Sequence, residues 1–303
     1  MTFELTVLGS SSALPTSTKF PAAQVLNAHE RFFLIDCGEG TQIQLRKAKV
    51  KFGRMNHIFI SHLHGDHVFG LFGLLSTLNL LGRKTTMHIF GHSDLKYIIA
   101  FYLEHFAPEN SYEIEIHPVV KRQLQLIFEN KAIEVFAFPL KHKVPTFGYL
   151  FREKKRLLNI KKEVIEKYNP SIKQIVEIKK GADLITEKDE IVSNKELTIV
   201  PPKPRSFAYC SDTMVYEKIT SYIKGVDLLY HEATFLECDT KLAKSTSHST
   251  TVQAATIAKK AGVKKLLIGH FSTRYNSYEE FLPESRKIFR HTEAAEDLSV
   301  YTI

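Results

Sequence analysis

The chain has 303 residues, 44% of them hydrophobic, so it can bury one large core or two smaller ones. Its 41 Lys and Arg against 33 Asp and Glu give a formal net charge of +8, which suits a polyanionic partner without identifying one. Three cysteines without paired spacing exclude a disulfide framework, and the absence of a leader pattern or a long apolar stretch predicts a cytoplasmic protein without a membrane segment.

Strands and helices alternate along most of the chain. Apolar runs predict strands at residues 3–8, 22–27, 31–36, 57–60, 86–90, 114–117, 124–128, 132–138, 147–151, 206–210, 227–231, 265–269 and 298–302. Helical periodicity predicts helices at about 68–82, 93–104, 214–223, 250–261 and 277–294. Ser249 and Thr250 give the fourth helix an N-cap signal, and Gly262 ends it. This order predicts an α/β fold in which two sheets pack face to face with helices outside.

Residues 152–204 break this pattern. Between Lys154 and Gly181 there are nine Lys or Arg and three Glu, without the apolar alternation found elsewhere. The segment ends in Pro201-Pro202-Lys203-Pro204, which cannot form a central strand. We interpret the segment as a basic arm inserted into a single domain that spans residues 1–303. A solvated, lysine-rich insertion that binds nothing is the alternative.

Residues 60–67 read Ile-Ser-His-Leu-His-Gly-Asp-His and follow an apolar strand directly. His62 and His64 point to the same side of an extended segment, and the turn after them redirects Asp66 and His67. Neutral imidazoles and carboxylates are the ligands that zinc and similar divalent ions prefer. The octet therefore predicts a metal site, with a chance histidine cluster on a polar loop as the alternative.

The octet resembles the signature of the metallo-β-lactamase superfamily. That resemblance implies a four-layer αββα sandwich and three further ligands, each at the end of a later strand. His142, Asp212 and His270 stand at such positions in the expected order. The resemblance implies two Zn2+ ions per subunit, with Mn2+ possible. It assigns the ligands in two sets bridged by Asp212: His62, His64 and His142 for one ion, and Asp66, His67 and His270 for the other.

Four further segments resemble the ribonuclease Z family, whose members remove the 3′ trailer from precursor tRNA. They are residues 36–42, 231–234, 247–250 and 269–275, and the likeness covers nearly the whole chain. It implies a metal-dependent endoribonuclease that leaves a 3′-OH on the tRNA and a 5′-phosphate on the trailer. It further implies that no nucleotide cofactor is needed, and that the protein is a homodimer in which the arm of one subunit binds the tRNA of the other.

Cleavage of a P–O3′ bond leaves an alkoxide, which needs a proton donor. His248 is the candidate, because it lies near a helix start whose positive end favours phosphate. Glu232 would fix its tautomer and raise its pKa, and the resemblance assigns the same pair. Asp66 is given a second role, in which it orients or deprotonates the attacking water. The alternatives are a polar residue beside a helix cap for His248 and a structural ion pair for Glu232.

Four residues are candidates for substrate binding, mainly by resemblance: Thr41, Gln42, Arg274 and Tyr275. A salt bridge and a packing ring are the alternatives for the last two. We assign no catalytic role to His231. Seven other histidines have no ligand-like context and are predicted to be structural or exposed: His29, His57, His88, His92, His105, His117 and His291.

Two other functions stay open at this point. A small-molecule phosphodiesterase or arylsulfatase-like hydrolase could use the same site, and it would be indifferent to tRNA and to loss of residues 154–181. A non-catalytic, zinc-stabilised RNA-binding protein would need neither a proton donor nor an open metal position.

Overall fold

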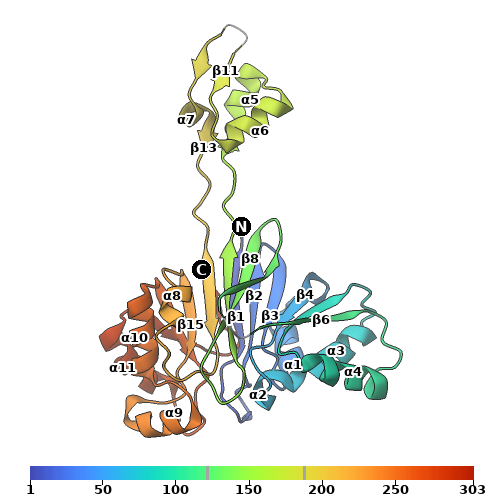
Figure 1. Ribbon diagram of the computed structural model, residues 1–303, viewed down its shortest axis with the longest axis vertical. Helices are drawn as coiled ribbons and strands as arrows, with labels where there is room; N and C mark the ends of the chain where they lie inside the picture. The colour runs from blue at the N-terminus through green and yellow to red at the C-terminus, as the bar shows by residue number, and fades with distance from the viewer. Residues whose placement is uncertain (121–122, 187–188) are drawn as a thin grey trace. The chain divides into compact units, whose positions relative to one another are not determined.

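Two seven-stranded sheets form the larger of the two units into which the chain divides (Figure 1). The computed structural model describes residues 1–120, 123–186 and 189–303. The larger unit comprises Met1–Arg152 and Arg205–Ile303, and the smaller unit comprises Glu153–Pro204. In the part of the chain that is described, no helix combines the length and the apolar content needed to cross a bilayer.

The first sheet has the strand order β18-β1-β2-β3-β4-β5-β6. Its strands are β1 (Phe3–Gly9), β2 (Ala23–Ala28), β3 (Arg31–Ile35), β4 (Met55–Phe59), β5 (Met87–Gly91), β6 (Ile114–Pro118) and β18 (Val300–Thr302). From β3 to β6 the strands run parallel, so helical connections return the chain across the sheet. The helices of this half are α1 (Thr41–Lys47), α2 (Gly65–Val68), α3 (Gly70–Leu80) and α4 (Leu95–Phe106), and η1 (Phe52–Arg54) is a short 3-10 turn.

The second sheet has the order β17-β16-β15-β14-β9-β8-β7. Its strands are β7 (Gln125–Glu129), β8 (Ile133–Pro139), β9 (Phe147–Glu153), β14 (Ser206–Cys210), β15 (Leu228–Glu232), β16 (Lys265–Gly269) and β17 (Thr292–Ala294). The strands from β14 to β17 run parallel. The helices of this half are α8 (Ile219–Tyr222), α9 (Thr240–Thr246), α10 (Thr251–Ala261) and α11 (Phe281–Ile288), with 3-10 turns η2 (Glu237–Asp239) and η3 (Tyr278–Glu280).

Three apolar layers hold the sheets and helices together. Aromatic side chains fill the layer between the sheets, where Phe59 packs edge-on against Tyr149 with ring centroids 5.4 Å apart. A second layer lies between the first sheet and helices α1, α3 and α4, and a third between the second sheet and helices α8, α10 and α11. Figure 1 shows these helices on the outer sides of the sheets. The predicted four-layer αββα sandwich is confirmed.

The boundaries of several predicted elements hold, and two helices were wrong in length. Helix α10 begins after Thr250, which forms a capping box with Gln253, and ends at Gly262 with φ 64°. The helix predicted over 277–294 ends at Ile288, because residues 292–294 pair instead with β16 as strand β17. The helix predicted over 214–223 is only α8, residues 219–222. Helices α1 and α9 were not predicted.

The smaller unit contains short strands and helices around a core of its own. Its elements are β10 (Asn159–Ile160), α5 (Lys162–Tyr168), α6 (Ile172–Lys180), β11 (Leu184–Ile185), β12 (Ile191–Val192), α7 (Asn194–Leu197) and β13 (Thr198–Ile199). Val164, Ile178, Leu184 and Leu197 form the core. Asn169 ends α5 with φ 40°, a left-handed conformation that Asn tolerates better than most residues other than Gly.

Candidate metal centre

The predicted ligands come from both sheets and meet where strands of each sheet end. The octet follows β4 of the first sheet, and α2 redirects its second half. His142 follows β8, Asp212 follows β14 and His270 follows β16, all in the second sheet. Polar side chains at the carboxyl ends of neighbouring strands converge in this way because the strands share one direction. All seven predicted ligands are therefore brought together within the larger unit.

His62, His64 and His142 form the first group of donor atoms, together with Asp212. Nδ1 of His64 lies 3.0 Å from Nε2 of His62 and 3.3 Å from Nε2 of His142. Burial lowers the pKa of all three imidazoles. They are neutral at physiological pH, which is the form that binds a metal ion.

Asp66, His67 and His270 form the second group. Nε2 of His67 lies 3.3 Å from Nε2 of His270, and Oδ2 of Asp66 lies 3.5 Å and 3.4 Å from these two nitrogens. Burial alone would raise the pKa of Asp66, but the two imidazoles, chiefly His67, lower it below its usual range. Burial would lower the pKa of His67, but Asp212, Asp66 and Asp36 raise it. A bound cation would take the place of that proton.

The Asp212 carboxylate lies between the two groups. Its Oδ1 is 3.4 Å from Nε2 of His67 and 3.2 Å from Nε2 of His270. Its Oδ2 is 3.5 Å from Nε2 of His62 and 3.8 Å from Nε2 of His142. Oδ1 is buried and has no hydrogen-bond partner among the described residues, so a cation is the natural group to satisfy it.

Two divalent cations fit this donor set. Ligand atoms about 2.0–2.2 Å from one tetrahedral ion lie about 3.3–3.6 Å from each other, close to the separations within each group. Hydrogen bonds cannot satisfy all the contacts among these ligand atoms. Each ring nitrogen carries at most one proton, and each group contains at least three ligand atoms that lie close to one another. The site is thus suited to hold metal ions, with five histidines and two aspartates as the candidate ligands.

A second set of hydrogen bonds orients the imidazoles. Nδ1 of His142 donates to the Ser247 carbonyl at 2.8 Å, and Nδ1 of His270 contacts Oγ1 of Thr234 at 3.0 Å. Nδ1 of His67 lies 2.7 Å from Oδ2 of Asp36. Such contacts fix which ring nitrogen faces the metal.

Asp36 contacts a candidate ligand and was not predicted from the sequence. It is fully buried at the end of β3 and also accepts hydrogen bonds from the Ser61 amide, the Ser61 hydroxyl and the Tyr209 hydroxyl. Its place in the unusual segment 36–42 was the available signal. The backbone at Asp36 and at His270 is left-handed, with φ 56° and φ 61°, an arrangement that costs free energy in residues other than Gly.

Glu232 and His248 form a tight pair beside the metal centre. Nδ1 of His248 lies 3.0 Å from Oε1 of Glu232 and 4.0 Å from Oδ2 of Asp212. Glu232 is fully buried, and its carboxylate also accepts hydrogen bonds from the amides of Thr213, Ser249 and Thr234. This network holds one carboxylate orientation and therefore one orientation of the His248 ring.

The pair shifts the pKa of each partner in opposite directions. Burial would lower the pKa of His248, but the Glu232 carboxylate raises it to about 9. Burial would raise the pKa of Glu232, but His248 lowers it. His248 is therefore protonated and Glu232 ionised at neutral pH. Because Nδ1 is engaged by Glu232, Nε2 is the nitrogen left to donate a proton.

The candidate substrate-binding residues differ in burial and in the contacts they make. Thr41 is buried and its hydroxyl donates to the Gly38 carbonyl at 2.6 Å. Gln42 accepts from Thr77 of α3 at 3.4 Å. Arg274 is exposed with its guanidinium 5.4 Å from the Phe235 ring centroid.

Tyr275 and His231 both make internal contacts. The Tyr275 hydroxyl donates to Asp239 and accepts from the Leu236 amide at 3.1 Å, and the Tyr275 ring packs against Phe281. These contacts support the alternative in which the Tyr275 ring packs inside the protein and does not bind substrate. His231 is buried and its Nδ1 contacts the Glu232 carbonyl at 2.7 Å, away from the donor atoms described above.

Known proteins resemble this chain along its whole length. Ribonuclease Z of Bacteroides fragilis is 44% identical over 295 residues, which are 97% of each chain. Ribonuclease Z of Porphyromonas gingivalis W83 is 45% identical over 295 residues, again 97% of each chain. The crystal structure of human tRNase Z, short form, superposes with a TM-score of 0.72 at 29% identity and covers 99% of each chain.

Two further likenesses are more distant. The metallo-β-lactamase fold protein YhfI of Bacillus subtilis has a TM-score of 0.69 at 16% identity over 99% of each chain, which shows the shared fold. A family model described as anti-Pycsar protein Apyc1 matches residues 3–133, less than half of the chain.

Proposed function

The chain belongs to the ribonuclease Z family, and we propose from this membership that it is the endoribonuclease that removes the 3′ trailer from precursor tRNA. The observation that carries the proposal is the Glu232–His248 pair beside a complete set of donors for two metal ions. A protein that only bound RNA would need no proton donor at this position. Such an enzyme would work in the cytoplasm, where the buried thiols of Cys37 and Cys210 stay reduced.

Zinc is the proposed metal, with two ions per subunit. Imidazole-rich sites with a few carboxylates favour zinc over magnesium, which prefers oxygen ligands. His62, His64 and His142 would hold one ion, Asp66, His67 and His270 the other, and Asp212 would bridge them. When bound, the two ions activate a water molecule and stabilise the negative charge of an in-line displacement at phosphorus.

The protein side chains supply the proton transfers. His248 would donate the proton on Nε2 to O3′ as the P–O3′ bond breaks, which leaves a 3′-OH on the tRNA and a 5′-phosphate on the trailer. Glu232 would act through His248 as a positioning residue. Asp66, whose Oδ2 accepts from the Ala13 amide at 2.9 Å, would orient or deprotonate the attacking water.

The smaller unit is the proposed tRNA-binding arm. Five lysines on its basic half are exposed: Lys155, Lys162, Lys167, Lys173 and Lys180. A tRNA is recognised largely by its shape and its phosphates, for which such lysines are suited. Residues 154–180 are rich in lysine, whereas the part of the unit after Gly181 is richer in acidic residues. We therefore expect residues 154–180 to contact the RNA.

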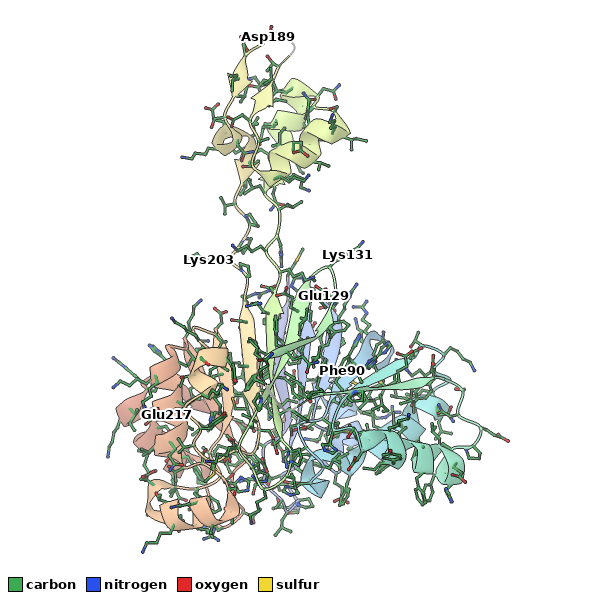
Figure 2. The ribbon with its side chains drawn as sticks, viewed as in Figure 1. Phe90, Glu129, Lys131, Asp189, Lys203 and Glu217 are labelled. Atoms are coloured by element: carbon green, nitrogen blue, oxygen red, sulfur yellow. The ribbon has the colours of Figure 1, made fainter. Side chains whose placement is uncertain are left out.

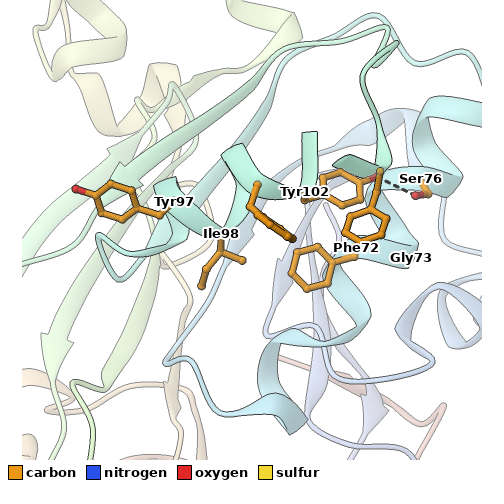
Figure 3. A pocket seen from close by; sticks show the side chains of 8 residues that line it. Phe72, Gly73, Ser76, Tyr97, Ile98 and Tyr102 are labelled. Atoms are coloured by element: carbon orange, nitrogen blue, oxygen red, sulfur yellow. Dashed lines mark hydrogen bonds between the residues drawn. The ribbon is translucent and has the colours of Figure 1, made fainter. Parts of the chain in front are cut away.

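A homodimer is the proposed assembly, and the larger unit offers a surface for it. Phe72 and Ser76 of α3 and Tyr97, Ile98, Phe101, Tyr102 and Phe106 of α4 line an apolar groove of about 760 Å³. Figure 3 shows the side chains that line it, with the Phe72 and Tyr102 rings near each other. Tyr97, Phe101 and Phe106 are 74%, 56% and 71% exposed, and an exposed apolar patch of this kind marks an interaction surface. Sedimentation should give a dimer for the wild type and a monomer for Phe101→Glu, while Val215→Glu on another surface should stay dimeric.

Cleavage of a 3′-extended precursor tRNA tests the proposed function. The zinc-loaded protein should cut after the discriminator nucleotide, His248→Ala should abolish turnover, and loss of the arm should weaken binding. The arm can be replaced by a short turn, because Arg152 of β9 and Ser206 of β14 are antiparallel neighbours in the second sheet. Hydrolysis of a nitrophenyl phosphodiester without any cleavage of tRNA would instead favour the small-molecule phosphodiesterase.

A further inference from the structure

Three side chains on β5 and β6 form a cluster that the proposed mechanism does not use. In this parallel pair His88 stands opposite Glu115, and Phe90 stands opposite His117. Residues 115 and 117 are two positions apart on one strand and so point to the same face of the sheet. The register brings His88 to that face as well, and the three side chains meet although 29 positions separate the first from the last.

The separations within the cluster are close to those expected around one metal ion, two of them slightly shorter. Nδ1 of His88 lies 3.1 Å from Nε2 of His117 and 3.1 Å from Oε2 of Glu115, and the latter two atoms are 3.5 Å apart. A tetrahedral ion about 2.0–2.2 Å from each ligand would place the ligands about 3.3–3.6 Å apart. Two imidazoles and a glutamate are also a donor set that zinc uses in proteins, with a fourth position open to water.

Hydrogen bonds alone leave this triangle unsatisfied. If both nitrogens donate to Oε2 of Glu115, their own 3.1 Å contact joins two N–H donors. If only one nitrogen carries a proton and donates to the other, the lone pair of the unprotonated nitrogen faces the carboxylate oxygen. With Glu115 ionised, each of these assignments leaves one repulsive contact, whereas a cation at the centre is attracted to all three atoms.

The rings of the cluster pack against neighbouring rings and remain within reach of solvent. The His57 ring stacks on His88 with centroids 5.2 Å apart, and His117 stacks on Phe90, labelled in Figure 2, with centroids 4.5 Å apart. The cluster's side chains are 30%, 43% and 39% exposed for His88, Glu115 and His117, so an ion can enter from solvent.

We propose that His88, Glu115 and His117 form a third divalent-metal site of the zinc type, separate from the two-metal centre. His57 on β4, which contacts His88, precedes His62 by five positions, which corresponds to about 16 Å of extended chain. The site spans β5 and the sheet-edge strand β6, so its ion would fasten that edge strand to its neighbour. His88 and His117, which the sequence predicts to be structural or exposed, would then also be metal ligands.

Counting bound metal in matched variants tests the proposal. The purified full-length protein would be stripped with a chelator, reloaded with Zn2+ or Co2+, freed of excess ion and analysed for metal per chain. Glu115→Gln and His117→Gln should each bind one ion fewer than the wild type. The control His105→Gln changes an exposed histidine on α4 and should bind as many ions as the wild type.

A second comparison separates this site from the two-metal centre. A His142→Ala, Asp212→Ala variant should lose ions from that centre but keep the one bound by the cluster, and Co2+ should show the visible absorption of a tetrahedral site. Adding Glu115→Gln to that background should remove this absorption. Equal metal content in the wild type, Glu115→Gln, His117→Gln and His88→Gln, with folding verified by circular dichroism, would overturn the proposal.

Discussion

Oδ2 of Asp36 lies 2.7 Å from Nδ1 of His67, and Nε2 of the same ring faces Asp66, Asp212 and His270. One buried carboxylate on the first sheet thus sets which nitrogen of a candidate ligand is available to a metal ion. Its other hydrogen bonds, from Ser61 and Tyr209, hold that carboxylate in place.

Asp36→Asn should therefore weaken metal binding although Asp36 is not itself a candidate ligand. Loss of such an outer contact typically lowers metal affinity about 10–100-fold, because the ring loses its fixed orientation and some of its basicity. Competition for Zn2+ against a chromophoric chelator would measure the change. Glu39→Gln, at an exposed position in the same loop, is the matched control, and equal affinity in both variants would refute the assigned role.

His248→Gln should reduce the rate of the chemical step about 10²–10⁴-fold, the usual contribution of a general acid. Single-turnover cleavage of precursor tRNA would measure the rate of the chemical step separately from substrate binding. A substrate with sulfur in place of the bridging O3′ should largely restore the rate, because a thiolate leaves without a proton. A defect of the same size on both substrates would indicate a structural role for His248.

Glu232→Gln should lower the pKa of His248. In the chelator-treated protein the His248 ring should titrate near 9, and in the variant it should titrate far lower, because burial remains while the carboxylate is lost. The folded-state pKa lies above the unfolded value of about 6.5, so the pair stabilises the fold fully below that pH. This stabilisation is lost as pH rises toward 9. NMR of the ring protons and thermal unfolding at pH 6 and pH 9 would check both statements.

Removal of metal should lower thermal stability as well as activity. An ion that binds only the folded state stabilises it by about 2.7 kcal/mol per site at a free concentration 100 times its Kd. Calorimetry of the chelated protein with and without added Zn2+ would show the shift. Mg2+ at equal concentration should have little effect, since its octahedral oxygen coordination does not suit clustered imidazoles.

Neutralising lysines in the smaller unit should raise KM for precursor tRNA with little change in kcat. In the triple variant Lys162→Ala, Lys167→Ala, Lys173→Ala, fewer phosphates are neutralised, so the dependence of binding on salt should become shallower by up to about 0.7–0.9 per lost contact. Fluorescence anisotropy across a salt series would measure this slope. A matched triple variant at Lys84, Lys259 and Lys287, exposed on the larger unit, should keep the wild-type slope.

Local pattern was enough to find the ligands, because residues 60–67 carry four of them in one octet and each remaining ligand ends an apolar run. Helix α10 was predictable for a similar reason, since its cap and its stop are adjacent in sequence. Other features depend on pairing across long separations. Residues 292–294 have a helical pattern but become a strand because β16 offers an edge, and the meeting of His88 with His117 follows only from the register of β5 and β6.

The left-handed backbone at Asp36 and His270 implies a trade-off between folding and function. Each position would be relaxed by Gly or Asn, and strain of this type costs about 1–3 kcal/mol. The hydrogen bonds of the buried Asp36 carboxylate and the place of His270 among the candidate ligands offset that strain in the metal-loaded protein. Substitution of either residue by Gly should therefore relieve the backbone strain without raising the melting temperature of the metal-loaded protein.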